Sequence, residues 1–128
     1  MSAQAAVQQG GAQRATRQGF RFRRRHAWWI PGLAIAVLGN QLSEQHGLGI
    51  WPIIVFQMAP HLPTFAGPRA IPVFNFGHHP VPPLALAAVA FVAALPPIWL
   101  IAGLGWLSHV VIGWGVGDGM RPSHGRHT

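Results

Sequence analysis

A long stretch with almost no fixed charge is the feature that most restricts what this chain can fold into. From residue 27 to residue 117, the only acidic or basic side chains apart from histidine are Glu44 and Arg69. Charged residues make up 9% of the chain and apolar residues 50%, whereas about 25% of an ordinary soluble domain is charged. A domain this small has too little interior to hide so much apolar surface from water. The sequence therefore predicts an all-α integral membrane protein whose solvent is lipid.

Four apolar segments separated by turn-forming residues follow one another in this stretch. We expect a four-helix bundle with membrane spans at residues 27–42, 48–62, 82–95 and 97–116. A crossing needs about 20 residues, so these spans are short, and flanking tryptophan and histidine side chains would supply the interfacial ends. Pro96 and Pro97 divide the last two segments into a helical hairpin. Pro52, Pro60 and Pro63 interrupt the second segment, which either crosses the membrane or is re-entrant.

The arginines predict the orientation of these spans. Residues 1–26 form a basic N-terminal tail that we expect to be disordered or extended, and residues 118–128 form a second tail. With four spans, both tails and the loop that carries Arg69 lie on one side, so all nine arginines face the same compartment. Positively charged loops remain cytoplasmic. We therefore predict a multi-pass protein of the cell inner membrane with both termini in the cytoplasm.

The basic tail beside the first apolar segment also predicts contact with anionic lipid headgroups. An arginine near such a surface contributes about 1 kcal/mol, and tryptophan rings settle at headgroup level. The residues expected to bind lipid are Arg21, Arg23, Arg24, Arg25, Trp28 and Trp29. No folded basic face accompanies this run, so we do not expect a nucleic-acid partner.

Histidines are the strongest candidates for a functional site. His109 lies in an apolar run of the fourth segment, and an ionisable side chain there should face the bundle interior. His61 ends the second segment and His78 precedes the third, on the same side of the membrane. These three residues are candidate ligands of a haem, a metal ion or a chlorin pigment. No HxxxH or HExxH spacing supports them. The alternative is that the rings form hydrogen bonds between helices or lie among headgroups, with no cofactor.

Few other side chains in the chain are suited to catalysis. The sequence has no cysteine, which excludes disulfides and thiolate chemistry. Its two carboxylates, Glu44 and Asp118, fall on opposite sides of the membrane in the predicted arrangement, so they cannot form an acid–base pair. No serine stands in a nucleophile-elbow motif. We therefore do not expect an enzyme.

Three motifs place the polar residues in a distinctive order. They are residues 56–61 (FQMAPH), residues 74–78 (FNFGH) followed by Pro82, and residues 106–109 (WLSH) with residues 117–121 (GDGMR). In this order the chain resembles a family of small bacterial membrane proteins, the domain-of-unknown-function 4260 family, over residues 28–122. The resemblance implies four helices and a membrane location, and it points to no particular activity. An acidic residue of that family is replaced here by His61, and an Asp-Arg pair by Gly113 and Trp114.

These features together favour a non-catalytic role. We expect an accessory or scaffolding subunit of a larger membrane assembly, bioenergetic or light-harvesting, with other membrane proteins or further copies of the chain as partners. Gly103 and Gly105 are suited to close helix contacts. One alternative is a histidine-ligated cofactor protein or membrane enzyme. A third is a small transporter, although the spans hold no carboxylate for proton coupling.

Overall fold

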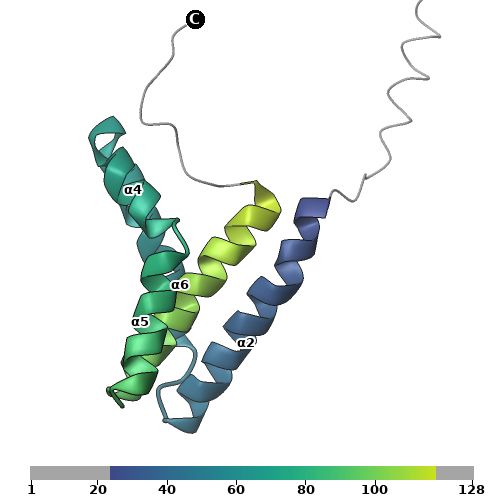
Figure 1. The fold of residues 1–128 in the computed structure, drawn as a ribbon, viewed down its shortest axis with the longest axis vertical. Coiled ribbons are helices and arrows are strands. Elements are labelled where there is room, and N and C mark those ends of the chain that lie inside the picture. Colours follow the sequence, from purple (N-terminus) through teal and green to yellow (C-terminus); the bar gives the residue numbers. More distant parts are fainter. Residues whose placement is uncertain (1–23, 118–128) are drawn as a thin grey trace, which may run out of the picture.

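The fold is all-α, as predicted (Figure 1). The structure, a computed structural model, describes residues 24–117. In this part of the chain there are five α-helices, three 3-10 segments and no strand. The α-helices are α2 (Trp29–Gln45), α3 (Trp51–Met58), α4 (Ile71–Gly77), α5 (Val81–Val92) and α6 (Pro97–Val116). The 3-10 segments are η1 (Arg24–Trp28), η2 (Ala59–Ala66) and η3 (Pro68–Ala70).

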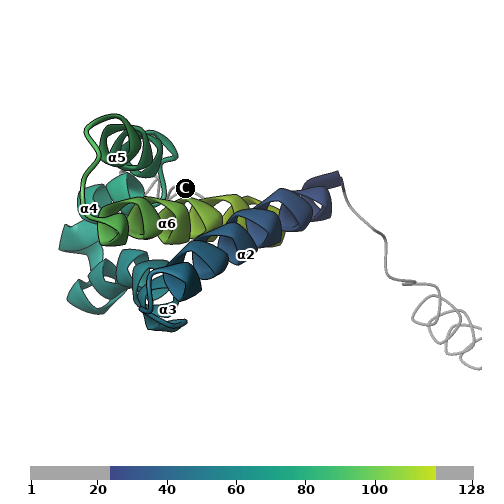
Figure 2. The same cartoon turned by 90° about the horizontal axis from the view of Figure 1, so that it is seen from below.

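Helix α6 is the centre of the molecule. It contacts α2, α3 and α5, and the two ribbon views show it between α2 and α5 (Figures 1 and 2). Residues on every side of α6 are apolar or small, which suits a helix surrounded by neighbours. With 20 residues it is the one described helix long and apolar enough to cross a membrane. Its bounds coincide with the fourth predicted span.

Glycines decide how closely the helices pack on α6. A Cβ atom on Gly103 would lie 2.9 Å from a backbone nitrogen of α5, so only a residue without a side chain fits there. Gly32 and Gly39 of α2 lie in the same way against Ile112 and Leu104 of α6. This pairing shows that α2 and α6 run antiparallel. Small residues thus bring the helix backbones together, here within one chain.

The second predicted span contains two kinds of helix. It begins as α3 and continues from Ala59 as the 3-10 segment η2. Pro60 and Pro63 lack the backbone N–H that an α-helix needs, and a 3-10 segment tolerates this interruption better over a short run. Gly67, with a φ of 73°, ends η2. The sequence identified the prolines as an interruption, and the structure shows what form it takes.

Each pass of the chain along the bundle is called a limb here, and the third limb, between η3 and α6, corrects one expectation. The sequence predicted a loop between residues 62 and 82, but α4 (Ile71–Gly77) forms a helix there and packs on η2. Pro72 lies in the first turn of α4, where proline is tolerated. Phe74 anchors the helix because its side chain is 2% exposed. The limb therefore consists of α4 followed by α5, and the run of apolar residues in α4 is too short to be recognised as a span.

The hairpin predicted at Pro96 and Pro97 is confirmed. Helix α5 ends at Val92 and α6 begins at Pro97. Within the turn, the backbone N–H of Leu95 donates a 3.0 Å hydrogen bond to the carbonyl of Ala90, which satisfies one of the free carbonyls at the end of α5.

The start of the described chain corrects a second expectation. The tail was predicted to extend to residue 26, but η1 already forms at Arg24. It packs on the end of α6, where Arg25 lies against Gly117 and the rings of Trp28 and Trp114 meet edge to face at 5.2 Å. A cation near a helix C-terminus is favourable. The remaining tail residues, with the predicted lipid ligands Arg21 and Arg23 and the segment 118–128, lie outside the described residues.

Candidate functional site

Three histidines from three separate elements meet at one point. His61 lies in η2, His78 directly follows α4, and His109 lies in the second half of α6. Each offers a ring nitrogen that lies within 4.8 Å of the other two. These are the three residues that the sequence singled out, and the structure brings them together.

The contact between α3 and α6 brings His61 to His109. The side-chain amide of Gln57 in α3 donates a 2.8 Å hydrogen bond to the hydroxyl of Ser108 in α6. That hydroxyl in turn donates a 2.8 Å hydrogen bond to the carbonyl of Gly105. His61 lies one turn beyond Gln57, and His109 directly follows Ser108. Their rings meet edge to face, with centroids 4.5 Å apart and an angle of 88° between the ring planes. The polar bridge therefore holds α3, which continues into η2 and His61, beside α6 and His109.

The end of α4 positions His78. Its backbone N–H donates a 3.1 Å hydrogen bond to the carbonyl of Phe74, and its ring Nδ1 lies 2.8 Å from the same oxygen. The ring also stacks on Phe74, with centroids 3.9 Å apart. Because a carbonyl only accepts hydrogen bonds, Nδ1 carries the proton. In the neutral ring, the lone pair of His78 is then on Nε2.

This lone pair points at His109. The two Nε2 atoms are 3.2 Å apart, so in the neutral cluster the ring N–H of His109 donates to His78. Two nitrogen ligands of a tetrahedral zinc ion, each at about 2.0–2.1 Å from the metal, would be about 3.3 Å apart. A metal ion in place of the shared proton would therefore need little movement of these two rings. His61 would complete a set of three ligands.

The surroundings of His78 resemble those of histidine ligands in metal sites. Such a ligand usually donates its other ring N–H to a carbonyl or carboxylate, which fixes both tautomer and orientation. The carbonyl of Phe74 does this for His78. The His78 side chain is 3% exposed, so water does not compete for its ring nitrogens. The Nε2 atom of His78 is thus oriented toward the centre of the cluster before any ion arrives.

The dimensions of the cluster distinguish between the cofactor classes considered above. A haem between His78 and His109 would need a flat slot between the rings, but their nitrogens are within hydrogen-bond distance. A chlorin needs an open face above one ligand, and here the ring of His61 lies edge to face with both other rings. Imidazole nitrogens suit zinc, copper, nickel and iron ions. The geometry therefore fits one bare metal ion best.

Neighbouring polar residues do not join the cluster. His79 follows His78 in sequence, but its Nδ1 accepts a 3.2 Å hydrogen bond from the backbone N–H of Val81 at the start of α5. His46 is exposed in the turn after α2. Glu44, the one carboxylate among residues 24–117, is also exposed. The candidate ligands are thus all histidine side chains.

Two residues that support the cluster were not predicted. Phe74 could have been found, because it lies four residues before His78 and side chains at this spacing share a helix face. Gln57 could not, since its partner Ser108 lies 51 residues away in the sequence. That pairing depends on how α3 packs on α6.

Four of the residues predicted to bind lipid lie in the described part of the chain. They are Arg24, Arg25, Trp28 and Trp29. The two tryptophans are 46% and 44% exposed. Each also packs on α6, Trp28 at Trp114 and Trp29 at Gly115. Each ring therefore packs partly on α6 and remains partly exposed at the surface.

Comparison with known proteins does not assign the chain to a family. No protein-family model, curated protein or solved structure matches it. The resemblance described above therefore stays a prediction. Over residues 24–117, fold and site define an all-α protein with one central apolar helix and a cluster of three histidines, of which His78 is buried and His61 and His109 are partly buried.

Proposed function

We propose that this protein is a small integral membrane protein that binds one divalent transition-metal ion, of the zinc class, through His61, His78 and His109. The single observation that carries this proposal is the convergence of three ring nitrogens, from three elements, within 4.8 Å of one another. Three protein ligands leave one position of a tetrahedral ion open to water or another small ligand.

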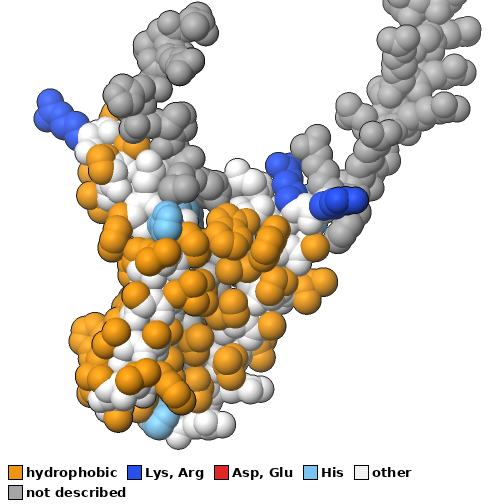
Figure 3. All heavy atoms as spheres, in the orientation of Figure 1, with side chains coloured by type: hydrophobic (Ala, Val, Ile, Leu, Met, Phe, Trp, Pro, Cys, Tyr) orange, Lys and Arg blue, Asp and Glu red, His pale blue; other side chains and the backbone are white. Residues whose placement is uncertain are grey.

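The surface of the molecule supports the membrane placement. Large apolar side chains are exposed along the helices, for example Phe91 at 76% and Val92 at 84%. Figure 3 shows apolar side chains over most of one face, with arginine side chains only at one end. The arginines in the described part are Arg24, Arg25 and Arg69. So much exposed apolar surface is typical of contact with membrane or partner proteins, and the clustered charge agrees with a cytoplasmic end.

The path of the chain supports four crossings. Helix α2, the α3–η2 limb, the α4–α5 limb and α6 follow one another along the molecule, and the described chain enters and leaves at the same end (Figure 1). In the other three limbs, no single described helix is long and apolar enough to cross a membrane alone. In our proposal they cross together with α6, and this even number of crossings keeps both termini in the cytoplasm.

A metal titration tests the proposed site. The protein, purified in mild detergent without a polyhistidine tag, should bind one zinc ion per chain in isothermal titration calorimetry. Cobalt should give the visible absorption of a tetrahedral site. Removing a residue that only orients a metal ligand already weakens metal binding by about 10–100-fold, and removing a ligand itself should weaken it more. We therefore expect His61→Ala, His78→Ala and His109→Ala each to weaken zinc binding by at least about 100-fold.

Two controls separate this site from incidental binding by other histidines. His79→Asn keeps a hydrogen-bond acceptor for the backbone N–H of Val81 and removes a ring next to the cluster. His46→Ala removes an exposed ring in the turn after α2. Both variants should bind zinc as the natural protein does. Unchanged binding in a His61/His78/His109 triple alanine variant would contradict the proposal.

A second candidate function is scaffolding within a larger membrane assembly. The observation that favours it is the outward face of α2, where large aliphatic side chains form an exposed stripe: Ile30, Leu33, Val37 and Leu38. A partner helix would cover such a stripe as well as lipid does. Gentle solubilisation of native membranes, followed by size analysis and identification of co-purifying chains, tests this function. A lone monomer would count against it.

A further inference from the structure

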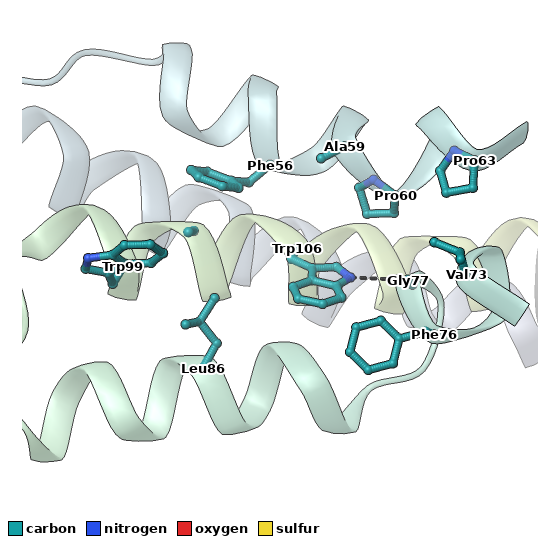
Figure 4. Close-up of a pocket in the computed structure, with 11 residues that line it drawn as sticks. Phe56, Ala59, Pro60, Pro63, Val73, Phe76, Gly77, Leu86, Trp99 and Trp106 are labelled. Carbon is teal, nitrogen blue, oxygen red and sulfur yellow. Dashed lines mark hydrogen bonds between the residues drawn. The ribbon is translucent and has the colours of Figure 1, made fainter. Parts of the chain in front are cut away.

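An apolar cavity lies beside the histidine cluster. Its volume is about 300 Å³, and it is bounded by α3, η2, α4, α5 and α6. Figure 4 shows the aromatic and apolar side chains that line it. The main ones are Phe56, Pro60, Val73, Phe76, Trp99 and Trp106.

The chemistry of the walls determines what the cavity accepts. The indole nitrogen of Trp106 donates a 2.6 Å hydrogen bond to the carbonyl of Gly77, so the polar atom of this ring is already satisfied. An apolar cavity of about 150 Å³ stays dry and binds benzene, and ligand pockets begin at about 300 Å³. With walls almost entirely of carbon, this cavity suits an apolar ligand.

The cavity is elongated, and the segment that joins two of its lining elements at one end carries an arginine. Its lining runs from Pro63 and Val73 at one end to Trp99 at the other (Figure 4). Pro63 belongs to η2 and Val73 to α4, and the short segment that joins these two elements carries the exposed Arg69. An apolar slot with a cation at one end matches a hydrocarbon chain with an anionic headgroup.

We propose that this cavity holds one acyl chain of an anionic phospholipid whose headgroup pairs with Arg69. The inference rests on the membrane placement proposed above and does not depend on the metal. Arg69 belongs to η3, in the turn that precedes α4, and this turn lies at the same end of the molecule as the two ends of the described chain (Figure 1). In the proposed placement, this is where cytoplasmic-leaflet headgroups would be. The chain would extend from there toward Trp99, along the direction that a lipid tail takes.

Tryptophan fluorescence provides a direct test, because Trp99 and Trp106 line the cavity. Phosphatidylglycerol with brominated chains, added to the full-length protein in mild detergent, should quench part of the emission and saturate at about one lipid per chain. Ala59→Phe fills the cavity and Arg69→Gln removes the headgroup contact. Each should weaken the saturable binding at least fivefold.

Matched variants and lipids decide the outcome. Ala34→Phe adds the same ring on an exposed position of α2, and Arg69→Lys keeps the positive charge at the proposed headgroup contact. Neither should change the binding. Equal quenching in all variants, or equal affinity for brominated phosphatidylcholine, would overturn the proposal. The His109→Ala variant should bind lipid normally. If the chain stays monodisperse in plain buffer, the membrane placement itself is wrong.

Discussion

Gly103 is the residue where two helix backbones leave no space for a side chain. A Cβ atom there would lie 2.9 Å from the backbone nitrogen of Ala87 and 3.0 Å from its Cα. Backbone atoms cannot rotate away as the end of a side chain can. We expect Gly103→Val to lower the free energy of unfolding in detergent by about 2 kcal/mol, because crowding in a packed core costs about 1–3 kcal/mol.

Circular dichroism during thermal unfolding in detergent would measure this change. Ala88→Val on an exposed position of α5 is the control, and surface changes of this kind stay within about 0.5 kcal/mol. Similar melting of both variants would show that α5 and α6 do not approach as closely as the structure indicates.

The candidate site shows how far single residues can be interpreted from sequence. His109 was identifiable because an ionisable group in an apolar helix needs a polar environment. His61 and His78 were identifiable only as neighbours on one side of the membrane, and their predicted convergence on His109 is seen in the structure. The hydrogen bond from Gln57 to Ser108 depends on how α3 packs on α6. The short distance between the His78 and His109 rings, which excludes a haem, depends on how the end of α4 meets α6. No spacing in the sequence reveals either contact.

The turn between α5 and α6 contains the one described non-glycine residue with a positive φ, Ala94 at 49°. A left-handed conformation costs an L-residue about 1–2 kcal/mol, and glycine avoids this cost. Glycine also has greater freedom in the unfolded chain, which lowers the free energy of unfolding by about 0.5–1 kcal/mol. We therefore expect Ala94→Gly to raise the free energy of unfolding by about 0.5–1 kcal/mol. The neighbouring Ala93 has a φ of −84°, so Ala93→Gly should lower it instead. Stabilisation by both substitutions would contradict this account of the turn.

At the scale of elements, predictability followed the length of the apolar runs. The extent of α6 was predicted to the residue, because Pro97 begins the helix and glycines lie near its end. Helix α4 was missed because its seven residues sit between prolines and polar residues, where a loop is the ordinary expectation. Its helical form depends on the burial of Phe74 against the rest of the molecule. Tertiary packing, rather than local propensity, determines such short elements.

For the whole molecule, the parallel course of α3–η2 and α6 links the fold to the proposed functions. It brings His61 to His109 on one side, and it forms a wall of the apolar cavity on the other. Both proposed sites lie toward the same part of the bundle, since Pro60 and Gly77 of the cavity directly precede two of the histidines. Metal and lipid would therefore be held by one frame of helices, with the arginine-bearing end nearest the headgroups.

The membrane topology of this frame is testable with unusual clarity, because the chain contains no cysteine. We expect Arg24→Cys and Arg69→Cys to react with a membrane-impermeant maleimide only from the cytoplasmic side, and His46→Cys and Ala93→Cys only from the opposite side. All four positions are exposed in the structure, so a lack of reaction would reflect the membrane rather than burial. Labelling of right-side-out and inverted vesicles separates the two sides. If the α3–η2 limb re-entered instead of crossing, Arg69 would be labelled together with His46. The three histidines and the cavity would then lose their place near the cytoplasmic headgroups.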